Sequence, residues 1–253
     1  MNLVAEIGIN HHGDEKYVLE YVDKLIDTKI DAITIQYRDT QFYKKYKKFI
    51  LNESVYEVIS AKIKSRNKLF GVAIKDSNKI NFFEKINTDF YKIIEKDLEN
   101  EELMERILLS NAKKIYLSTG MSSGDEIMNV LDRYKKIDKK RVILIHTTLS
   151  NKINKVNLES IRFMREKFSM NVAYGSHCEE YKSILISIGY SPESIFFYVK
   201  GNKFEKHPDQ EYAIDLDFVD KLIEEVRHSQ LSIGEYDKKK IFDIEPEKSV
   251  ENL

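Results

Sequence analysis

The chain has 253 residues, with 41 lysines and arginines against 42 aspartates and glutamates, and one cysteine, Cys178. This balance of charge gives no long-range field for nucleic acid, and a single cysteine excludes an internal disulfide. No stretch approaches the ~20 consecutive apolar residues that a membrane-spanning helix needs. We therefore expect a cytoplasmic, reduced protein that binds neither nucleic acid nor a membrane.

Short apolar or β-branched runs recur along the chain, and each predicts a buried parallel strand. In chain order the predicted strands are residues 3–9, 32–36, 69–74, 90–94, 114–118, 142–146, 171–174 and 194–200. Segments with apolar residues at helical spacing, such as Tyr17, Val18, Tyr21 and Leu25, lie between them. Eight alternations of strand and helix predict an α/β fold of the (β/α)8, or TIM barrel, type.

One such barrel takes roughly 250 residues, which leaves little of this chain for a second large domain. We assign residues 1–228 to the barrel and residues 229–253, which hold few apolar side chains, to a polar C-terminal tail. Pairing of two copies through helix faces, as a homodimer, is the default expectation.

In a (β/α)8 barrel the active site forms at the carboxyl ends of the strands, and here those ends are rich in polar side chains. In chain order they are Asn10, His11, His12, Gln36, Arg38, Lys75, Asp76, Lys92, Ser118, Thr119, His146, Thr147, Ser176, His177, Lys200, His207, Asp209 and Gln210. Lysines together with short hydroxyl groups suit a small anion such as a phosphate or carboxylate. Imidazoles in the same pocket could transfer protons or bind a divalent metal, and the spacing does not choose between these roles.

Five segments resemble the sialic acid synthases, which join phosphoenolpyruvate to an N-acetylated amino sugar. The segments are residues 5–11 (AEIGINH), 89–93 (DFYKI), 117–121 (LSTGM), the strand of His146 with the following residues 156–158 (VNL), and residues 174–177 (YGSH). The resemblance covers the barrel from end to end. It implies a transferase of carbohydrate biosynthesis that forms a carbon–carbon bond and yields a 2-keto-3-deoxy sugar acid.

The resemblance also implies site residues. Lys92, Ser118, Lys113 and Gln36 would bind phosphoenolpyruvate, and Asn10, Lys75 and Lys200 are further candidates for binding substrate. His177 matches a metal ligand and Asp209 an acidic residue of the last loop. For the base that activates water we consider His12, His146 and Asp209, and we favour Asp209 assisted by His177.

This chain departs from the family pattern at several positions. The family's strand-two lysine is Thr34 here, so that phosphate binding would have to use Arg38 or Lys75. The second metal-binding histidine aligns by spacing with Val199, although His207 follows eight residues later and could compensate. The sequence therefore does not decide whether the protein uses Mn²⁺ or Mg²⁺ as a cofactor. The family's C-terminal antifreeze-like domain has no counterpart in these 253 residues.

Three functional hypotheses follow. The first is a synthase that condenses phosphoenolpyruvate with an aldehyde or amino sugar. The second is a metal-free aldolase or lyase with Lys75 or Lys200 as a Schiff-base lysine. The third is an inactive barrel that acts as a ligand sensor or scaffold, motivated by the lost metal ligand and the lost strand-two lysine.

Overall fold

A computed structural model of the chain describes residues 1–134 and 138–234. Within these residues eight parallel strands pair in chain order, and β1 (Asn2–Gly8) pairs with β8 (Ser194–Lys200), which closes the sheet into a barrel. The other strands are β2 (Ala32–Tyr37), β3 (Leu69–Ile74), β4 (Phe90–Ile93), β5 (Lys114–Ser118), β6 (Val142–His146) and β7 (Val172–Ser176). The predicted (β/α)8 barrel is confirmed, and four of the predicted strands match at both ends.

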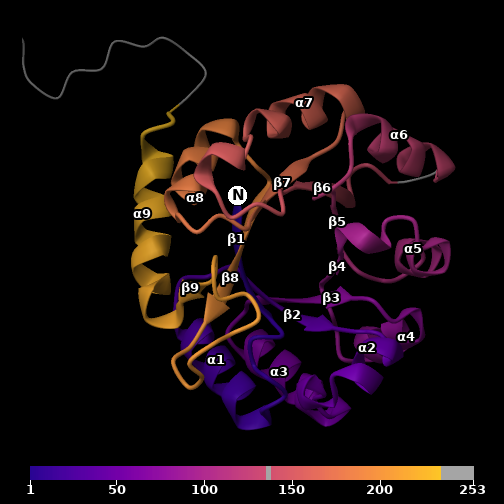
Figure 1. Cartoon of the computed structure of the whole chain (residues 1–253), viewed down its shortest axis with the longest axis vertical. Coiled ribbons are helices and arrows are strands. Elements are labelled where there is room, and N and C mark those ends of the chain that lie inside the picture. The colour runs from indigo at the N-terminus through magenta and orange to yellow at the C-terminus, as the bar shows by residue number, and fades with distance from the viewer. Residues whose placement is uncertain (135–137, 235–253) are drawn as a thin grey trace, which may run out of the picture.

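Helices surround the barrel on the outside, as Figure 1 shows in a view along the barrel. They are α1 (Glu15–Asp27), α2 (Thr40–Lys45), α3 (Glu53–Ser65), α4 (Ile80–Lys85), α5 (Glu101–Leu108), α6 (Gly124–Arg133), α7 (Glu159–Phe168), α8 (Lys182–Ser187) and α9 (Val219–Leu231). A short strand, β9 (Ile214–Asp215), pairs with the end of β8. No helix in the described parts of the chain is long and apolar enough to cross a membrane.

Helix starts are set locally by capping side chains. Asp14 accepts a hydrogen bond from the backbone N–H of Tyr17 at the start of α1. Ser123 and Glu126 form a capping box that begins α6. These caps satisfy backbone N–H groups that have no partner inside the helix.

The core has two parts, as expected for a barrel with an outer layer of helices. The larger part lies between the barrel and the helices. The smaller part fills the inside of the barrel and consists of Val4, Ala32, Phe90, Tyr116, Ile143, Ile145, Ala173 and Phe196. Gly71 of β3 leaves room for the Phe90 ring, because a Cβ at Gly71 would lie 2.0 Å from that ring.

Successive side chains of a strand point to opposite faces, so residues two positions beyond the inner core also point into the barrel. These next inward residues are Glu6, Thr34, Lys92, Ser118, Thr147, Gly175 and Tyr198. The inside of the barrel therefore changes from apolar to polar toward the carboxyl ends of the strands.

The C-terminal part of the described chain differs slightly from the predicted division. Helix α9 continues to Leu231, three residues into the segment expected to be a polar tail. Residues 235–253 of that predicted tail lie outside the described residues.

Candidate functional site

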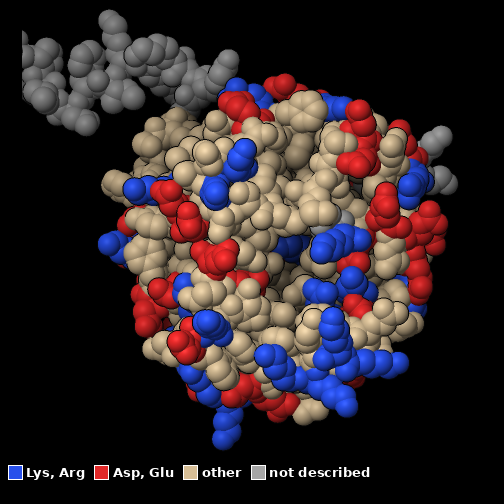
Figure 2. Space-filling view, in the orientation of Figure 1, with Lys and Arg blue, Asp and Glu red and all other residues tan. Residues whose placement is uncertain are grey.

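A cavity of about 340 Å³ opens where the polar inside of the barrel meets the loops after the strands. Its lining residues are Ile9, Gln36, Arg38, Lys92, Ile94, Lys96, Ser118, Leu149, His177, Tyr198, Asp209 and Tyr212. Figure 2 shows a hollow in the middle of this face, with Lys and Arg side chains beside it and more of them toward α2 and α4. The cavity therefore lies where barrels of this type place their active sites.

A buried ion pair joins two opposite sides of the barrel wall. The Lys92 ammonium donates to both Glu6 carboxylate oxygens, at 2.6 and 2.7 Å, and both side chains are only 4% exposed. An ammonium has three hydrogens, so this pairing leaves one for a ligand in the cavity. Lys92 therefore remains available to an anion, with its charge largely balanced by Glu6.

Three rings and a carboxylate form one side of the cavity. The Tyr198 ring lies 5.5 Å from the His177 ring and 5.4 Å from the Tyr212 ring, between centroids. The Tyr212 hydroxyl donates a 2.7 Å hydrogen bond to Asp209 Oδ1. Gly8 makes room for this group, because a Cβ there would lie 2.9 Å from Tyr198 Cε1 and 3.0 Å from Asp209 Oδ2.

Asp209 is held in place by Asn10, a fully buried residue at the end of β1. The Asn10 amide donates to the Val199 carbonyl at 2.9 Å, and its oxygen accepts from the Asp209 backbone N–H at 3.1 Å. Burial raises the pKa of Asp209 to about 6, and the nearby Glu6 charge acts in the same direction. A carboxyl group with this pKa can exchange protons near neutral pH.

His177 is neutral at the pH of most cells. Burial, together with the nearby Lys92 charge, lowers the pKa of His177 to about 3. Its Nδ1 lies 2.6 Å from the Thr147 hydroxyl, which fixes the orientation of the ring. Its Nε2 is the ring nitrogen that remains for a ligand.

The opposite side of the cavity carries positive charge. Arg38, at the end of β2, lies with its guanidinium carbon 4.4 Å from the Phe42 ring centroid, and its Nε is buried without a hydrogen-bond partner among the described residues. Lys96 is an exposed lining residue of the same cavity, and Gln36 and Ser118 add polar groups. This arrangement suits a bound anion.

Several of the residues predicted for the site lie elsewhere. Lys113 precedes β5 at the other end of the barrel, is 79% exposed, and pairs with Asp89 at 3.6 Å. His146 is on the outward face of β6, where its Nε2 lies 2.8 Å from the Val156 carbonyl. The inward residues of that strand are Ile143 and Ile145. Neither Lys113 nor His146 lines the cavity.

The two lysines proposed to form a Schiff base also lie outside the cavity. Lys75 is 3.2 Å from a carboxylate oxygen of Asp97. Lys200 donates to the Gln210 carbonyl at 3.2 Å and lies 3.6 Å from Asp215, beside a separate depression. Asn10 is buried behind the cavity and acts on the site through Asp209.

The structure corrects the alignment of Val199 with a metal ligand. Val199 is fully buried on the outside of the barrel, whereas its neighbour Tyr198 faces the cavity. His207 does not compensate, since its Nε2 lies 3.1 Å from the Tyr17 hydroxyl and it is not a lining residue. Among residues 1–134 and 138–234, no group of three or more His, Cys, Asp or Glu side chains could hold a metal ion.

Few side-chain atoms at the cavity are free to bind a metal ion. Both Glu6 oxygens are occupied by Lys92, and Asp209 Oδ1 is occupied by Tyr212. His177 Nε2 and Asp209 Oδ2 remain, so the described residues offer one free carboxylate oxygen at the cavity, whereas Mg²⁺ and Mn²⁺ prefer sets of oxygen ligands. The residues present do not fit the Mn²⁺ or Mg²⁺ site that the sequence left open.

Three residues of the site, Glu6, Tyr198 and Tyr212, were not among those predicted from the sequence. Glu6 is a single charged residue within an otherwise apolar strand, two positions after the inward Val4, and this pattern could have identified it. Tyr198 stands in the same relation to Phe196. Tyr212 lies in a loop, and no sequence pattern places it.

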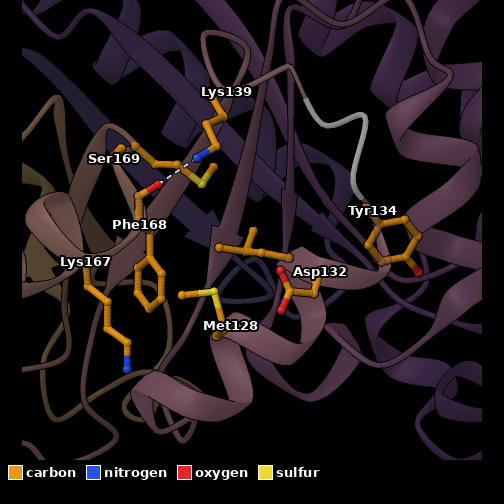
Figure 3. Close-up of a pocket in the computed structure, with 9 residues that line it drawn as sticks. Met128, Asp132, Tyr134, Lys139, Lys167, Phe168 and Ser169 are labelled. Carbon is orange, nitrogen blue, oxygen red and sulfur yellow. Dashed lines mark hydrogen bonds between the residues drawn. The ribbon is translucent and has the colours of Figure 1, made fainter.

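A second cavity, of about 380 Å³, lies near the ends of α6 and α7. Figure 3 shows Met128, Asp132 and Tyr134 on one side of it and Lys167 and Phe168 on the other. Lys139 donates to the Phe168 carbonyl at 3.0 Å. None of the residues predicted for the site lines this cavity.

The fold and the cavity define a TIM-barrel protein in which basic side chains and a buried carboxyl group line a cavity at the carboxyl ends of the strands. The model of the NeuB family matches residues 21–238. The chain belongs to the NeuB family, and the resemblance to sialic acid synthases that the motifs indicated is confirmed.

Individual relatives agree with this assignment. An uncharacterized protein of Methanocaldococcus jannaschii is 24% identical over 93% of this chain and 73% of its own length. The N,N'-diacetyllegionaminic acid synthase of Campylobacter jejuni is 22% identical over 94% of this chain and 78% of its own. A solved structure of N-acetylneuraminic acid synthetase from Leptospira borgpetersenii, in complex with citrate, has a TM-score of 0.85 at 22% identity, covering 94% of this chain and 87% of that one.

Proposed function

We propose that this protein condenses phosphoenolpyruvate with an aldehyde or amino sugar to form a 2-keto-3-deoxy sugar acid. The observation that carries the proposal is the cavity itself, in which basic side chains face a carboxyl group that exchanges protons near neutral pH. Membership of the NeuB family and the relatives named as synthases of nonulosonic acids support it.

In this proposal the phosphoenolpyruvate anion binds on the basic side of the cavity. Arg38 and Lys96 bring positive charge to this side of the cavity, and Lys92 offers its third hydrogen. Ser118 and Gln36 add neutral hydrogen bonds. Charge-assisted contacts of this kind hold phosphate and carboxylate groups in a fixed orientation, which lowers the barrier by positioning the reactants.

The reaction proceeds by attack of the methylene carbon of phosphoenolpyruvate on the aldehyde carbon. The new carbon–carbon bond uses the electron pair of the enol double bond, and the carbonyl electron pair moves to oxygen. Water then adds to the positively charged former enol carbon and loses a proton to Asp209. The aldehyde oxygen takes up a proton from solvent. The tetrahedral intermediate collapses to a ketone as its C–O bond to phosphate breaks and its hydroxyl proton passes to the departing phosphate.

Asp209 is suited to take the proton from water. Its Oδ1 accepts from Tyr212 and its Oδ2 faces Tyr198 beside Gly8. Neutral His177 lies on the same side and can accept or donate one hydrogen bond through Nε2. We assign the base to Asp209 with His177 as its partner, and we assign no catalytic part to His146.

Binding of phosphoenolpyruvate is the first test. A ligand at a hundredfold excess over its Kd stabilises the folded protein by about 2.7 kcal/mol. For a chain of this size that corresponds to a rise in Tm of roughly 5–10 °C. The measurement is thermal unfolding with and without phosphoenolpyruvate, with EDTA in one series and Mn²⁺ in another.

Variants make the test specific to this cavity. Arg38→Met should reduce the phosphoenolpyruvate-induced shift, because it removes a positive charge while keeping an apolar stem over Phe42. Lys113→Met is the matched control at the other end of the barrel and should leave the shift unchanged. If the wild-type protein shows no shift in any condition, the proposal fails, and a sensor or scaffold for another ligand replaces it.

A further inference from the structure

The end of β8 presents a phenol to the cavity, one position before Val199, the residue that spacing aligns with a metal ligand. Tyr198 points inward from β8, whereas Val199 points outward into the core between barrel and helices. The Tyr198 ring centroid lies 5.5 Å from that of His177 and 5.4 Å from that of Tyr212, and these two rings are themselves 4.8 Å apart. The Lys92 ammonium lies 5.6 Å from the Tyr198 centroid. Its hydroxyl makes no hydrogen bond to another described residue, unlike that of Tyr212.

Tyr198 shares its surroundings with the two remaining donors of the cavity. Its ring and Asp209 Oδ2 both pack against the bare Cα of Gly8, as the short distances to an added Cβ at that position show. The His177 ring lies 5.5 Å from the Tyr198 ring, between centroids. The imidazole of His177 and the carboxylate of Asp209 therefore both lie beside the phenol of Tyr198.

The charges nearby favour a neutral hydrogen-bond donor over a cation at this point. Lys92 is already present as a cation, and the Glu6 carboxylate that could offset a further positive charge is bound to it through both oxygens. A neutral phenol is a poor ligand for divalent metal ions but a good donor to a carbonyl oxygen. Such a donor stabilises negative charge that develops on that oxygen.

We propose that Tyr198 occupies the place of a third metal ligand beside His177 and Asp209, and that its hydroxyl hydrogen-bonds the carbonyl oxygen of the acceptor aldehyde. The first part, that Tyr198 occupies the ligand position, is independent of the proposed function. The second part, the hydrogen bond to the aldehyde oxygen, rests on the proposed condensation. During attack of the enol carbon, the carbonyl electron pair moves onto the oxygen that Tyr198 contacts. No electron transfer or further reactant is involved.

The first part can be tested with Mn²⁺ alone. Free Mn²⁺ is counted by electron paramagnetic resonance while the protein is titrated. We expect the wild-type protein not to retain Mn²⁺, and Tyr198→His, which supplies a third donor, to bind it more than about tenfold more tightly. Tyr212→His places the same side chain in the loop after β8, where it removes the hydroxyl that holds Asp209 Oδ1, and it should gain less affinity than Tyr198→His.

The wild-type measurement alone can contradict the first part of the proposal, because tight Mn²⁺ binding by the wild-type protein overturns it. The first part is therefore tested even if the Tyr198→His protein folds poorly. Folded Tyr198→His that gains no affinity, or Tyr212→His that gains as much, shows that Tyr198 is not in the ligand position. Circular dichroism and thermal unfolding establish that each variant is folded.

The second part is tested by Tyr198→Phe, which removes only the hydroxyl. Phosphate release from phosphoenolpyruvate with a panel of aldose and N-acetylhexosamine acceptors should fall roughly 100-fold or more, as expected for loss of one donor to a developing oxyanion. The stabilisation by phosphoenolpyruvate should persist. Unchanged release overturns the role of Tyr198, whereas absence of both stabilisation and release in the wild-type protein overturns the condensation itself.

Discussion

Glu6 on β1 and Lys92 on β4 form an ion pair across the inside of the barrel, with contacts of 2.6 and 2.7 Å and almost no exposure to solvent. Removing two charges from water is costly, and only close, fully hydrogen-bonded geometry offsets that cost. The pair lies above the apolar inner core and below the cavity. A change to this ion pair should therefore alter both the free energy of unfolding of the barrel and the charge at the cavity.

Breaking this pair should destabilise the fold strongly. Glu6→Gln leaves the Lys92 ammonium buried without a countercharge, and we expect a loss of about 3–5 kcal/mol in the free energy of unfolding. Asp217→Asn breaks an exposed pair with Lys24 and is the control, with an expected loss below about 1 kcal/mol. Urea unfolding measures both. If the two substitutions lowered the free energy of unfolding equally, the Lys92 ammonium would have to be accessible to water in the folded protein.

The double substitution Glu6→Gln with Lys92→Met should recover part of that stability, because it removes the isolated charge. Stabilisation by phosphoenolpyruvate should nevertheless be weaker in the double variant, since Lys92 would no longer offer its third hydrogen. Full stabilisation by phosphoenolpyruvate in a folded double variant would exclude Lys92 from binding.

The pH dependence of stability should report the environment of Asp209. Its pKa in the folded protein, about 6, exceeds the ordinary value of 3.8, so the folded state binds more protons than the unfolded state between these values. The contribution of Asp209 to stability is therefore complete below pH 4 and is lost as the pH rises to about 6. The loss is on the order of 3 kcal/mol.

Comparison with Asp209→Asn isolates this effect, because the amide does not titrate. The difference in unfolding free energy between the wild-type and variant proteins should decline from pH 4 to pH 6 and stay constant above. Tyr212→Phe removes a hydrogen bond that lowers the pKa of Asp209 and should move the decline to higher pH. A difference that does not change with pH would show that Asp209 titrates normally.

Much of the fold could be predicted from the sequence, because a buried parallel strand is a short apolar run and its helix an amphipathic one. The direction of individual side chains could not be predicted with the same success. The end of strand six places His146 at the site, and spacing aligns Val199 with a metal ligand, but a shift of one residue along a strand reverses the face. His146 points outward beside inward Ile145, and Val199 points outward beside inward Tyr198.

Pairing between distant segments was also beyond the sequence. Lys75 pairs with Asp97 from the next βα unit, and Lys92 with Glu6, 86 positions earlier in the chain. These contacts depend on how the barrel closes. The place of Asp209 after the last strand put it near the site, but its role as the acidic residue came only from the family resemblance, since nothing in its neighbourhood marks it as buried.

Gly8 should not tolerate a side chain. Its φ of +57° lies in the left-handed region, which costs an alanine about 1–2 kcal/mol, and an added Cβ would contact both Tyr198 and Asp209. Gly8→Ala should therefore lower stability and also reduce stabilisation by phosphoenolpyruvate. Gly189→Ala is the control, because nothing lies within 4 Å of the added atom. If the two variants unfold at the same temperature, the close packing at Gly8 is relaxed in solution.

Asn10 should position Asp209 through a donor and an acceptor that only an amide supplies together. Asn10→Asp keeps an acceptor for the Asp209 N–H but cannot donate to the Val199 carbonyl, and Asn10→Ala removes both contacts. Because the site is fully buried, either change should cost about 1–3 kcal/mol. Both variants should also shift the pH at which the Asp209 contribution is lost, since the carboxyl group is no longer fixed in its buried place. Loss of stability with an unchanged pH profile would make Asn10 a purely structural residue and leave Asp209 positioned by Tyr212 alone.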